Sequence, residues 1–345
     1  MTFKCSIIIS LVLFIFPLSL FSEIKITIMS YNVHNLFDDV DNGSEYAEFK
    51  REKSIWSTEQ FEKKLQHIAR AIRESCFKGA DVIALQEVEN LNALRLLRDR
   101  YLRGMGYKYM VTAPQEGIAV RVALLSRIPI RKVLCHSMVE WQGRSLRNIM
   151  EAELEYKGNT FFIFNNHWKS KSGGVRPTEQ ARLSAASVIL RRIGSILEER
   201  PDADMVILGD LNENIEEYLE VRGGVSSGGY QTALIPMAAP FEESYVTSSI
   251  FLADRPESAG LFNGRLVFYE PWYELDPQEQ GSYLYQGRWQ TPDHILLSAS
   301  LFDGQGLVYQ PGDFKVERSD FLLKWVCSDH LPLIIILRIS GNEEG

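Results

Sequence analysis

The sequence reads Met205-Val206-Ile207-Leu208-Gly209-Asp210-Leu211-Asn212 at a point where a short apolar run meets a polar segment. An apolar run of this length, bounded by turn residues, is typical of a fully buried strand. Polar side chains that stand at the ends of several such strands can converge on one rim of a sheet. We therefore interpret Asp210 and Asn212 as candidate site residues and expect strands of the same form elsewhere in the chain.

Five further segments place polar residues directly beside an apolar strand. They are Ser30 to Asn35 after Ile24 to Met29, Gln86-Glu87 after Val82 to Leu85, Asn165 to Lys169 after Phe161 to Phe164, Asp293-His294 before Ile295 to Leu297, and Ser328-Asp329-His330 before the last strand. Four of the six histidines fall in these segments: His34, His167, His294 and His330. One segment alone could be a helix cap or a turn, but together they indicate one shared site.

Helical patterns alternate with these strands. Apolar residues recur at helical spacing from Phe61 to Ile72 behind Ser57, from Leu91 to Leu102, and from Pro177 to Arg200 before Pro201. Hairpin-like runs mixed with helix-strand units predict an α/β (α+β) protein with two mixed β-sheets packed face to face and helices outside. No linker divides residues 23–345, so we expect one domain. An insert at about 213–290, rich in glycine and aromatic residues, is predicted to be loop-rich and surface-built.

The first 22 residues hold one charge, Lys4, and an apolar run from Ile7 to Phe21. This run is shorter than a membrane-spanning helix needs and indicates a signal peptide over residues 1–22, with an uncleaved N-terminal anchor as the alternative. We therefore expect an exported protein, periplasmic or secreted.

The chain has 345 residues and a formal net charge of −8. Removal of Lys4 with the leader leaves 36 basic against 45 acidic residues, a net charge of −9. This balance excludes a protein that coats nucleic acid by bulk attraction. The three cysteines beyond the leader, Cys76, Cys135 and Cys327, form no Cys-x-x-Cys pair, so we expect neither a zinc site nor a disulfide framework.

The residue types at the strand ends favour hydrolysis of a phosphate ester. Carboxylate and amide oxygens without cysteine ligands select Mg²⁺, Mn²⁺ or Ca²⁺. A histidine beside a carboxylate supplies a general base, and His330 with Asp329 or another acid is the best candidate. Because no Ser or Cys nucleophile motif is present, we expect in-line attack by water.

The chain resembles the endonuclease/exonuclease/phosphatase family over about residues 26–338. The family's ordered series is present: Asn32, Gln86-Glu87, Asn166-His167, Gly209-Asp210 with Asn212, Asp293 before a strand, and Ser328-Asp329-His330 with Pro332. The resemblance implies a four-layer α/β sandwich and a divalent-metal-dependent phosphoesterase.

The resemblance also implies roles for these residues. Glu87 would be the principal metal ligand, with Asn32 and Asp329 beside it. Asp210 and Asn212 would orient the attacking water and hold the phosphate. His330, aligned by Asp329, would act as base or phosphate stabiliser, and Asp293 would support the metal or a histidine. His167 would bind the phosphate or protonate the leaving group.

Three functions remain open at this point. The run Asn166 to Lys171 looks most like secreted bacterial nucleases of the family, with DNA or RNA as substrate and Lys169, Arg147 and Trp289 as candidate substrate-binding residues. The aromatic-rich insert, with Trp272 and Tyr273, allows a sphingomyelinase-type phospholipase C that docks on a phospholipid surface. The third alternative is an exported binding protein without catalysis. No stable protein partner is implied.

Overall fold

The computed structural model describes residues 24–51, 55–76, 78–138, 140–223, 231–239 and 248–340. The predicted leader, residues 1–22, lies outside these ranges and stays a prediction. Within the described ranges, no helix has both the length and the apolar character needed to cross a membrane.

Strands and helices alternate along the described chain. The strands are β1 (Lys25–Leu36), β2 (Val82–Val88), β3 (Tyr109–Thr112), β4 (Arg121–Ser126), β5 (Ile130–His136), β6 (Ile149–Tyr156), β7 (Asn159–His167), β8 (Asp204–Asp210), β9 (Leu234–Pro236), β10 (Ile250–Ala253), β11 (Gly260–Phe262), β12 (Arg265–Tyr269), β13 (Tyr283–Tyr285), β14 (Arg288–Gln290), β15 (Asp293–Leu297), β16 (Leu307–Val316) and β17 (Leu333–Ile339). The helices are α1 (Thr58–Ser75), α2 (Leu91–Leu96), α3 (Val175–Glu199) and α4 (Glu217–Gly223), with a π-helical turn at Leu97–Tyr101 and 3-10 turns at Ala47–Phe49, Pro256–Ser258, Pro271–Glu274, Ala299–Phe302 and Leu322–Lys324.

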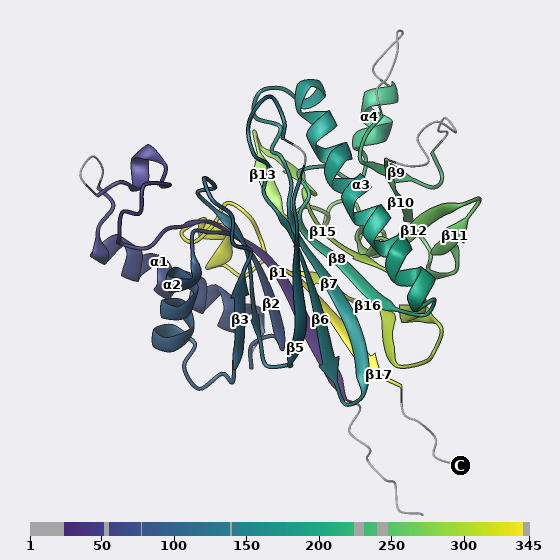
Figure 1. The fold of residues 1–345 in the computed structure, drawn as a ribbon, viewed down its shortest axis with the longest axis horizontal. Helices are drawn as coiled ribbons and strands as arrows, with labels where there is room; N and C mark the ends of the chain where they lie inside the picture. Colours follow the sequence, from purple (N-terminus) through teal and green to yellow (C-terminus); the bar gives the residue numbers. More distant parts are fainter. Residues whose placement is uncertain are drawn as a thin grey trace, which may run out of the picture.

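Two mixed sheets form the centre of the molecule. The first has the order β16-β17-β1-β2-β4-β3, and the second has the order β5-β6-β7-β8-β15-β12-β10-β9, with β11 beside β12. Figure 1 shows α3 lying along the sheet that contains β7 and β8, while α1 and α2 lie on the far side of the other sheet. The predicted fold of two mixed sheets with helices outside, a four-layer α/β sandwich, is confirmed.

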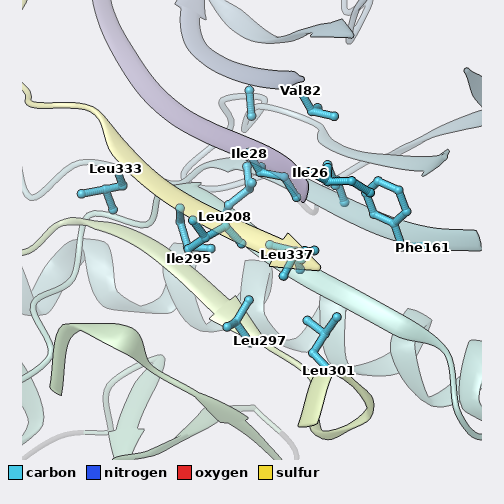
Figure 2. Close-up of a cluster of buried hydrophobic side chains, with 14 of the residues drawn as sticks. Ile26, Ile28, Val82, Phe161, Leu208, Ile295, Leu297, Leu301, Leu333 and Leu337 are labelled. Atoms are coloured by element: carbon cyan, nitrogen blue, oxygen red, sulfur yellow. The ribbon is translucent and has the colours of Figure 1, made fainter. Parts of the chain in front are cut away.

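The core between the sheets follows from the alternation of side chains along each strand. Ile28 of β1 and Leu337 of β17 face Leu208 of β8 and Ile295 of β15, and all four are completely buried. Figure 2 shows these side chains between the two layers of strands. The alternate residues of the same strands, such as Ile207, pack outward against the helices.

The predicted helices form because their apolar residues recur on one face. In α1, Ser57 caps the first turn by accepting a hydrogen bond from the backbone N–H of Gln60, and one face of the helix, with Phe61, Leu65, Ile68 and Ile72, is buried against the first sheet. In α3 the buried face includes Ile189 and Ile193, whereas Leu190 is only half-buried.

The insert at about 213–290 contributes short strands to the second sheet and an aromatic residue to the core. Strands β9, β10 and β12 extend the second sheet beyond β15. Trp272 is completely buried, and its indole N–H donates to the carbonyl of Asp293. These strands have only three to five residues, too few to produce a readable alternation.

Candidate active site

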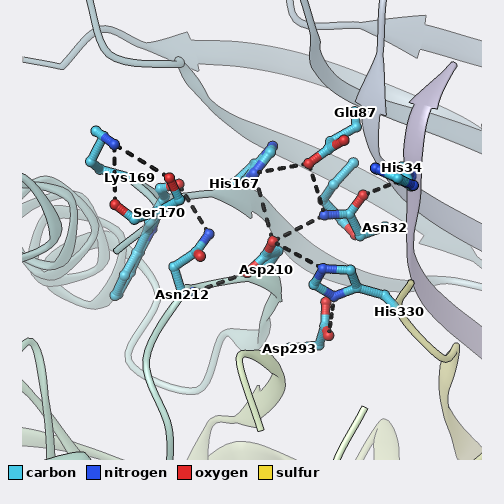
Figure 3. Close-up of polar contacts among 12 residues, drawn as sticks. Asn32, His34, Glu87, His167, Lys169, Ser170, Asp210, Asn212, Asp293 and His330 are labelled. Atoms are coloured by element: carbon cyan, nitrogen blue, oxygen red, sulfur yellow. Dashed lines mark hydrogen bonds and ion pairs between the residues drawn. The ribbon is translucent and has the colours of Figure 1, made fainter. Parts of the chain in front are cut away.

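The two sheets carry the candidate residues at one end of the sandwich. Strands β1 and β2 are parallel, as are β7 and β8, so the carboxyl ends within each pair lie at one edge. Strand β15 is antiparallel to β8 and pairs Asp293 with Asp210. Strand β17 is antiparallel to β1, so the segment before it brings His330 to the same edge. Figure 3 shows how these side chains converge.

The imidazole of His330 is held by Asp293. His330 Nδ1 lies 2.7 Å from Asp293 Oδ2, and Ser282 donates its hydroxyl to the same oxygen. Burial alone would lower the pKa of His330, but the carboxylates of Asp293 and Asp210 outweigh burial and raise that pKa to about 10. His330 is therefore held in its charged form at neutral pH.

The prediction that Asp329 aligns His330 is wrong. Asp329 Oδ1 is 4.0 Å from His330 Nε2, the side chain is 42% exposed, and the same oxygen lies 3.7 Å from Nδ1 of His34. Asp329 lies at a bend before β17, where Ser328 accepts a hydrogen bond from the backbone N–H of His330, and its carboxylate faces His34 while Nδ1 of His330 faces Asp293. Of the two functions that the resemblance allowed for Asp293, supporting a metal or a histidine, the geometry shows contact with the histidine.

Asp210 lies at the centre of the site. Asn32 Nδ2 donates to Asp210 Oδ2 at 3.0 Å and to Glu87 Oε1 at 3.3 Å, while Oδ1 of Asn32 accepts from the backbone N–H of His34. Burial raises the pKa of Asp210 to about 7. The charge of His330 opposes this rise, and those of Asp293 and Glu87 add to it. Asn32 thus turns its amide nitrogen, not its oxygen, toward both carboxylates.

His167 completes the wall opposite His330. Its Nε2 lies 3.6 Å from Glu87 Oε1 and 3.6 Å from Asp210 Oδ2, and within the described residues its buried Nδ1 has no hydrogen-bond partner. Burial lowers the pKa of His167 well below its ordinary value, and the charges of Arg147, His330 and Lys169 lower it further. At neutral pH the imidazole is therefore uncharged, in contrast to that of His330.

The backbone at the strand ends is locally strained. Glu87 and Asn212 have φ values of 64° and 53°, a left-handed conformation that few residues other than glycine adopt. The backbone N–H of Asn35 donates to Glu87 Oε2 at 2.8 Å, and that of Asn212 donates to Asp210 Oδ1 at 3.0 Å. These turns hold one oxygen of each carboxylate and leave the other directed into the site.

The predicted substrate-binding residues are divided between two places. Arg147 and Lys169 line one cavity together with His167. Trp289 does not join them, because the guanidinium of Arg318 lies 4.2 Å from its ring centroid and Trp325 packs beside it. His294 is also away from the site: it is completely buried and binds Glu270 and the carbonyl of Glu213.

Three further residues support the site. Tyr283 packs its ring on His330, with centroids 4.8 Å apart, and Ser282 binds Asp293. Lys64 of α1 donates to the carbonyls of His34 and Cys327. Of these three, Tyr283 could be recognised in the sequence, because it is an aromatic residue ten positions before Asp293.

The donor set fits a hard divalent cation. Ligand atoms of Asp210, Asp293 and His330 lie within 4.8 Å of one another, but Asp293 Oδ2 already accepts two hydrogen bonds. Glu87 and Asp210 each direct one oxygen toward the same space, and the Glu87 side chain, 17% exposed, opens to solvent. A cation held by Glu87 would offset the negative charge of Glu87, which contributes to the raised pKa of Asp210.

A family model connects this geometry to known proteins. The model described as Endonuclease/Exonuclease/phosphatase family matches residues 27–225, more than half of the chain. The chain belongs to this family. Its members are typically divalent-metal-dependent phosphoesterases, which agrees with the predicted chemistry, and the resemblance noted in the sequence is confirmed.

Solved structures give the same fold. The truncated TDP2 of Caenorhabditis elegans is 15% identical over 91% of this chain and 98% of its own, with a TM-score of 0.53. The D. rerio TDP2 complexed with single strand DNA product is 16% identical over 91% and 98%, with a TM-score of 0.54. A family protein from Bacteroides vulgatus is 13% identical over 92% and 100%, with a TM-score of 0.54. None of the curated proteins matches the sequence of this chain.

Proposed function

We propose that this family member is an exported, divalent-metal-dependent phosphodiesterase, an endonuclease that hydrolyses DNA or RNA by in-line attack of water. The observation that carries the proposal is the set of side chains around Asp210. Asn32, His167 and His330 face this one carboxylate from three different strand ends, and His330 is fixed by Asp293. A buried carboxylate between two histidines is suited to move protons at a phosphate.

Different residues carry out proton transfer and charge stabilisation in this reaction. Asp210, whose Oδ1 is held by the backbone of Asn212, accepts the proton of the attacking water at Oδ2. His330 directs Nε2 toward the same space and stabilises charge on the phosphate oxygens. His167, uncharged, donates a hydrogen bond to the phosphate or to the leaving oxygen. A bound cation, held by Glu87, would neutralise a phosphate oxygen and stabilise the leaving group.

Two observations favour nucleic acid over phospholipid as the substrate. The D. rerio TDP2 structure contains a single strand DNA product. In addition, Trp272, one of the aromatic residues of the insert, is part of the core and is not available to a membrane surface.

Activity is tested on purified residues 23–345 with Mg²⁺ or Mn²⁺, using plasmid, single-stranded DNA, RNA and sphingomyelin vesicles as substrates. We expect internal cleavage of nucleic acid that is lost with chelator and with Glu87→Gln. The matched control is Glu198→Gln, at an exposed residue of α3, which should retain full activity. Release of phosphocholine with intact nucleic acid would overturn the nuclease proposal, and equal inertness of wild type and Glu87→Gln on every ester would support a binding protein.

Export is tested separately on the full chain. Residues 1–22 should be absent from the protein recovered outside the cytoplasm, as measured by N-terminal sequencing. Retention of these residues on membrane-bound protein would support the anchor instead.

A further inference from the structure

A cavity of about 570 Å³ opens beside the catalytic centre and shares His167 with it. Its walls come from the loop after β1, the β3–β4 and β5–β6 connections, the residues after β7, and α3. This volume lies within the range of small-molecule sites in proteins. Because His167 lines the cavity and also contacts Asp210, a substrate group bound in the cavity would lie next to a phosphate bound at Asp210.

The cavity is positively charged in an acidic protein. Arg144, Arg147 and Lys169 line it, and no Asp or Glu is among its lining residues in the described part of the chain. The three cations act on one another: burial lowers the pKa of Lys169, and Arg147, Arg182 and Arg144 lower it further. Cations that are gathered without carboxylate neighbours form a site for an anion such as phosphate.

A tight turn places an aromatic ring beside these cations. Trp141 and Arg144 exchange two backbone hydrogen bonds, of 2.9 and 3.0 Å, across Gln142 and Gly143. Both central residues have positive φ, 49° and 68°, as type I′ hairpin turns require. Side chains opposite one another across such a turn are neighbours, and Lys169 Nζ lies 5.5 Å from the centroid of the Trp141 ring.

The geometry points to a subsite for one unpaired nucleotide that flanks the scissile phosphate on the His167 side. Arg144, Arg147 and Lys169 bind its phosphate, and its base stacks on Trp141. This inference rests on the proposed nuclease function and gives it a substrate class, single-stranded nucleic acid, because a base within a duplex cannot leave its stack to reach the ring without an energetic cost.

The test compares three phosphodiesters: a single-stranded DNA oligonucleotide, the same sequence as a duplex, and bis(p-nitrophenyl) phosphate, which has no flanking nucleotide. Wild type should prefer the single strand. Arg144→Gln and Trp141→Ala should each lower kcat/KM on the single strand, relative to bis(p-nitrophenyl) phosphate, by about tenfold, the loss expected for one stacking or phosphate contact.

Two further variants serve as controls. Trp141→Phe keeps an aromatic ring and should retain most of the preference for the single strand, which would show that the loss in Trp141→Ala comes from the missing ring and not from misfolding. Arg191→Gln, at an exposed residue of α3 outside the cavity, is the matched control and should leave the ratio unchanged.

Binding of the oligonucleotide in the presence of chelator provides a second readout. Arg144→Gln should reduce the slope of log Kd against log salt concentration by about 0.7, as expected for one phosphate contact on a single strand. Trp141→Ala should weaken binding without changing this slope.

The outcomes separate this inference from the proposed function. If wild type cleaves nucleic acid and both variants retain its substrate ratio and salt slope, the subsite is wrong and the nuclease function stands. If wild type cleaves no nucleic acid, the proposed function fails and the subsite with it. If Arg144→Gln impairs only the hydrolysis of sphingomyelin vesicles, the cavity binds a lipid headgroup and the inference is overturned.

Discussion

Lys64 of α1 and Cys327, before the last strand, are joined by a hydrogen bond of 2.6 Å from the lysine Nζ to the backbone carbonyl. The same Nζ donates to the carbonyl of His34 at 2.7 Å. One side chain outside the site thus fixes the two chain segments that carry Asn32 and His330. Because Lys64 touches none of the groups that we place at the phosphate, it is a positioning residue.

Replacing Lys64 should reduce turnover more than substrate binding. We expect Lys64→Met to lower kcat by about tenfold or more with a smaller change in KM, since displacement of catalytic groups acts mainly on the transition state. Lys64→Arg should recover part of kcat because it retains a donor. Lys63→Met, at the exposed neighbouring lysine, is the control, and an equal loss in that variant would argue against a positioning role.

The contact between Asp293 and His330 predicts unequal effects for two aspartates. Asp293→Asn should lower kcat by about 10²–10⁴, because the amide no longer fixes the charge and orientation of the imidazole. Asp329→Asn, at the more exposed carboxylate, should lower kcat less. Steady-state kinetics and the melting temperatures of both variants provide the measurement. A larger catalytic loss in Asp329→Asn would contradict the contact between Asp293 and His330.

The buried carboxylate of Glu151 predicts a loss of stability in acid. Burial would raise its pKa, but hydrogen bonds from Arg192 and a contact with His136 outweigh burial and lower the pKa from 4.5 to about 2. A lowered pKa in the folded state stabilises the protein above pH 4.5, and this contribution is lost as the pH falls from 4.5 toward 2.

Urea unfolding at pH 7 and pH 3 tests this prediction. Glu151→Gln should lower the free energy of unfolding at pH 7 by about 1–3 kcal/mol, and the difference from wild type should shrink at pH 3. Glu155→Gln, which removes an exposed ion pair with Arg131, should cost about 1 kcal/mol or less. A difference for Glu151→Gln that is the same at both pH values would rule out the charge as its cause.

Gly209 stands where no other residue fits. Its φ is 124°, and a Cβ built there would lie 2.1 Å from the carbonyl oxygen of Asn166 on the neighbouring strand. Gly209→Ala should therefore destabilise the fold by at least about 2 kcal/mol. Gly158→Ala, in a turn where a Cβ meets nothing within 4 Å, should cost only about 1 kcal/mol from its backbone conformation. Equal melting temperatures for the two variants would show that the close approach is relieved.

Much of the fold could be predicted because long apolar runs and amphipathic helices are local signals. The run from Met205 to Leu208 becomes the centre of β8, and the residues that follow it reach the site. The same alternation separates Asp293 from His294: Asp293 shares the inner face with Ile295, whereas His294 points outward and is buried elsewhere. Because successive residues of a strand face opposite sides, Asp293 and His294 cannot both face the site.

Other features depend on pairings between distant residues and leave no local signal. Asp293 contacts His330 because β15 and β17 belong to different sheets that lie close together at one end of the sandwich. No spacing of residues in the sequence encodes this contact. The short strands of the insert join the second sheet next to β15 and have too few residues to show an alternation of apolar and polar side chains. The turn at Gln142-Gly143, in contrast, is local, because a glycine in a two-residue turn is a signal within the sequence that places Trp141 beside Arg144.

The pairing of β1 with β17 joins the beginning and the end of the described chain, from Lys25 with Arg338 to Ser30 with Leu333. Asn32 lies in the first strand of the described chain, and His330 directly precedes the last one. Loss of either strand would therefore remove both the edge of the first sheet and one side of the site, so no fragment that lacks β1 or β17 can assemble the residues around Asp210.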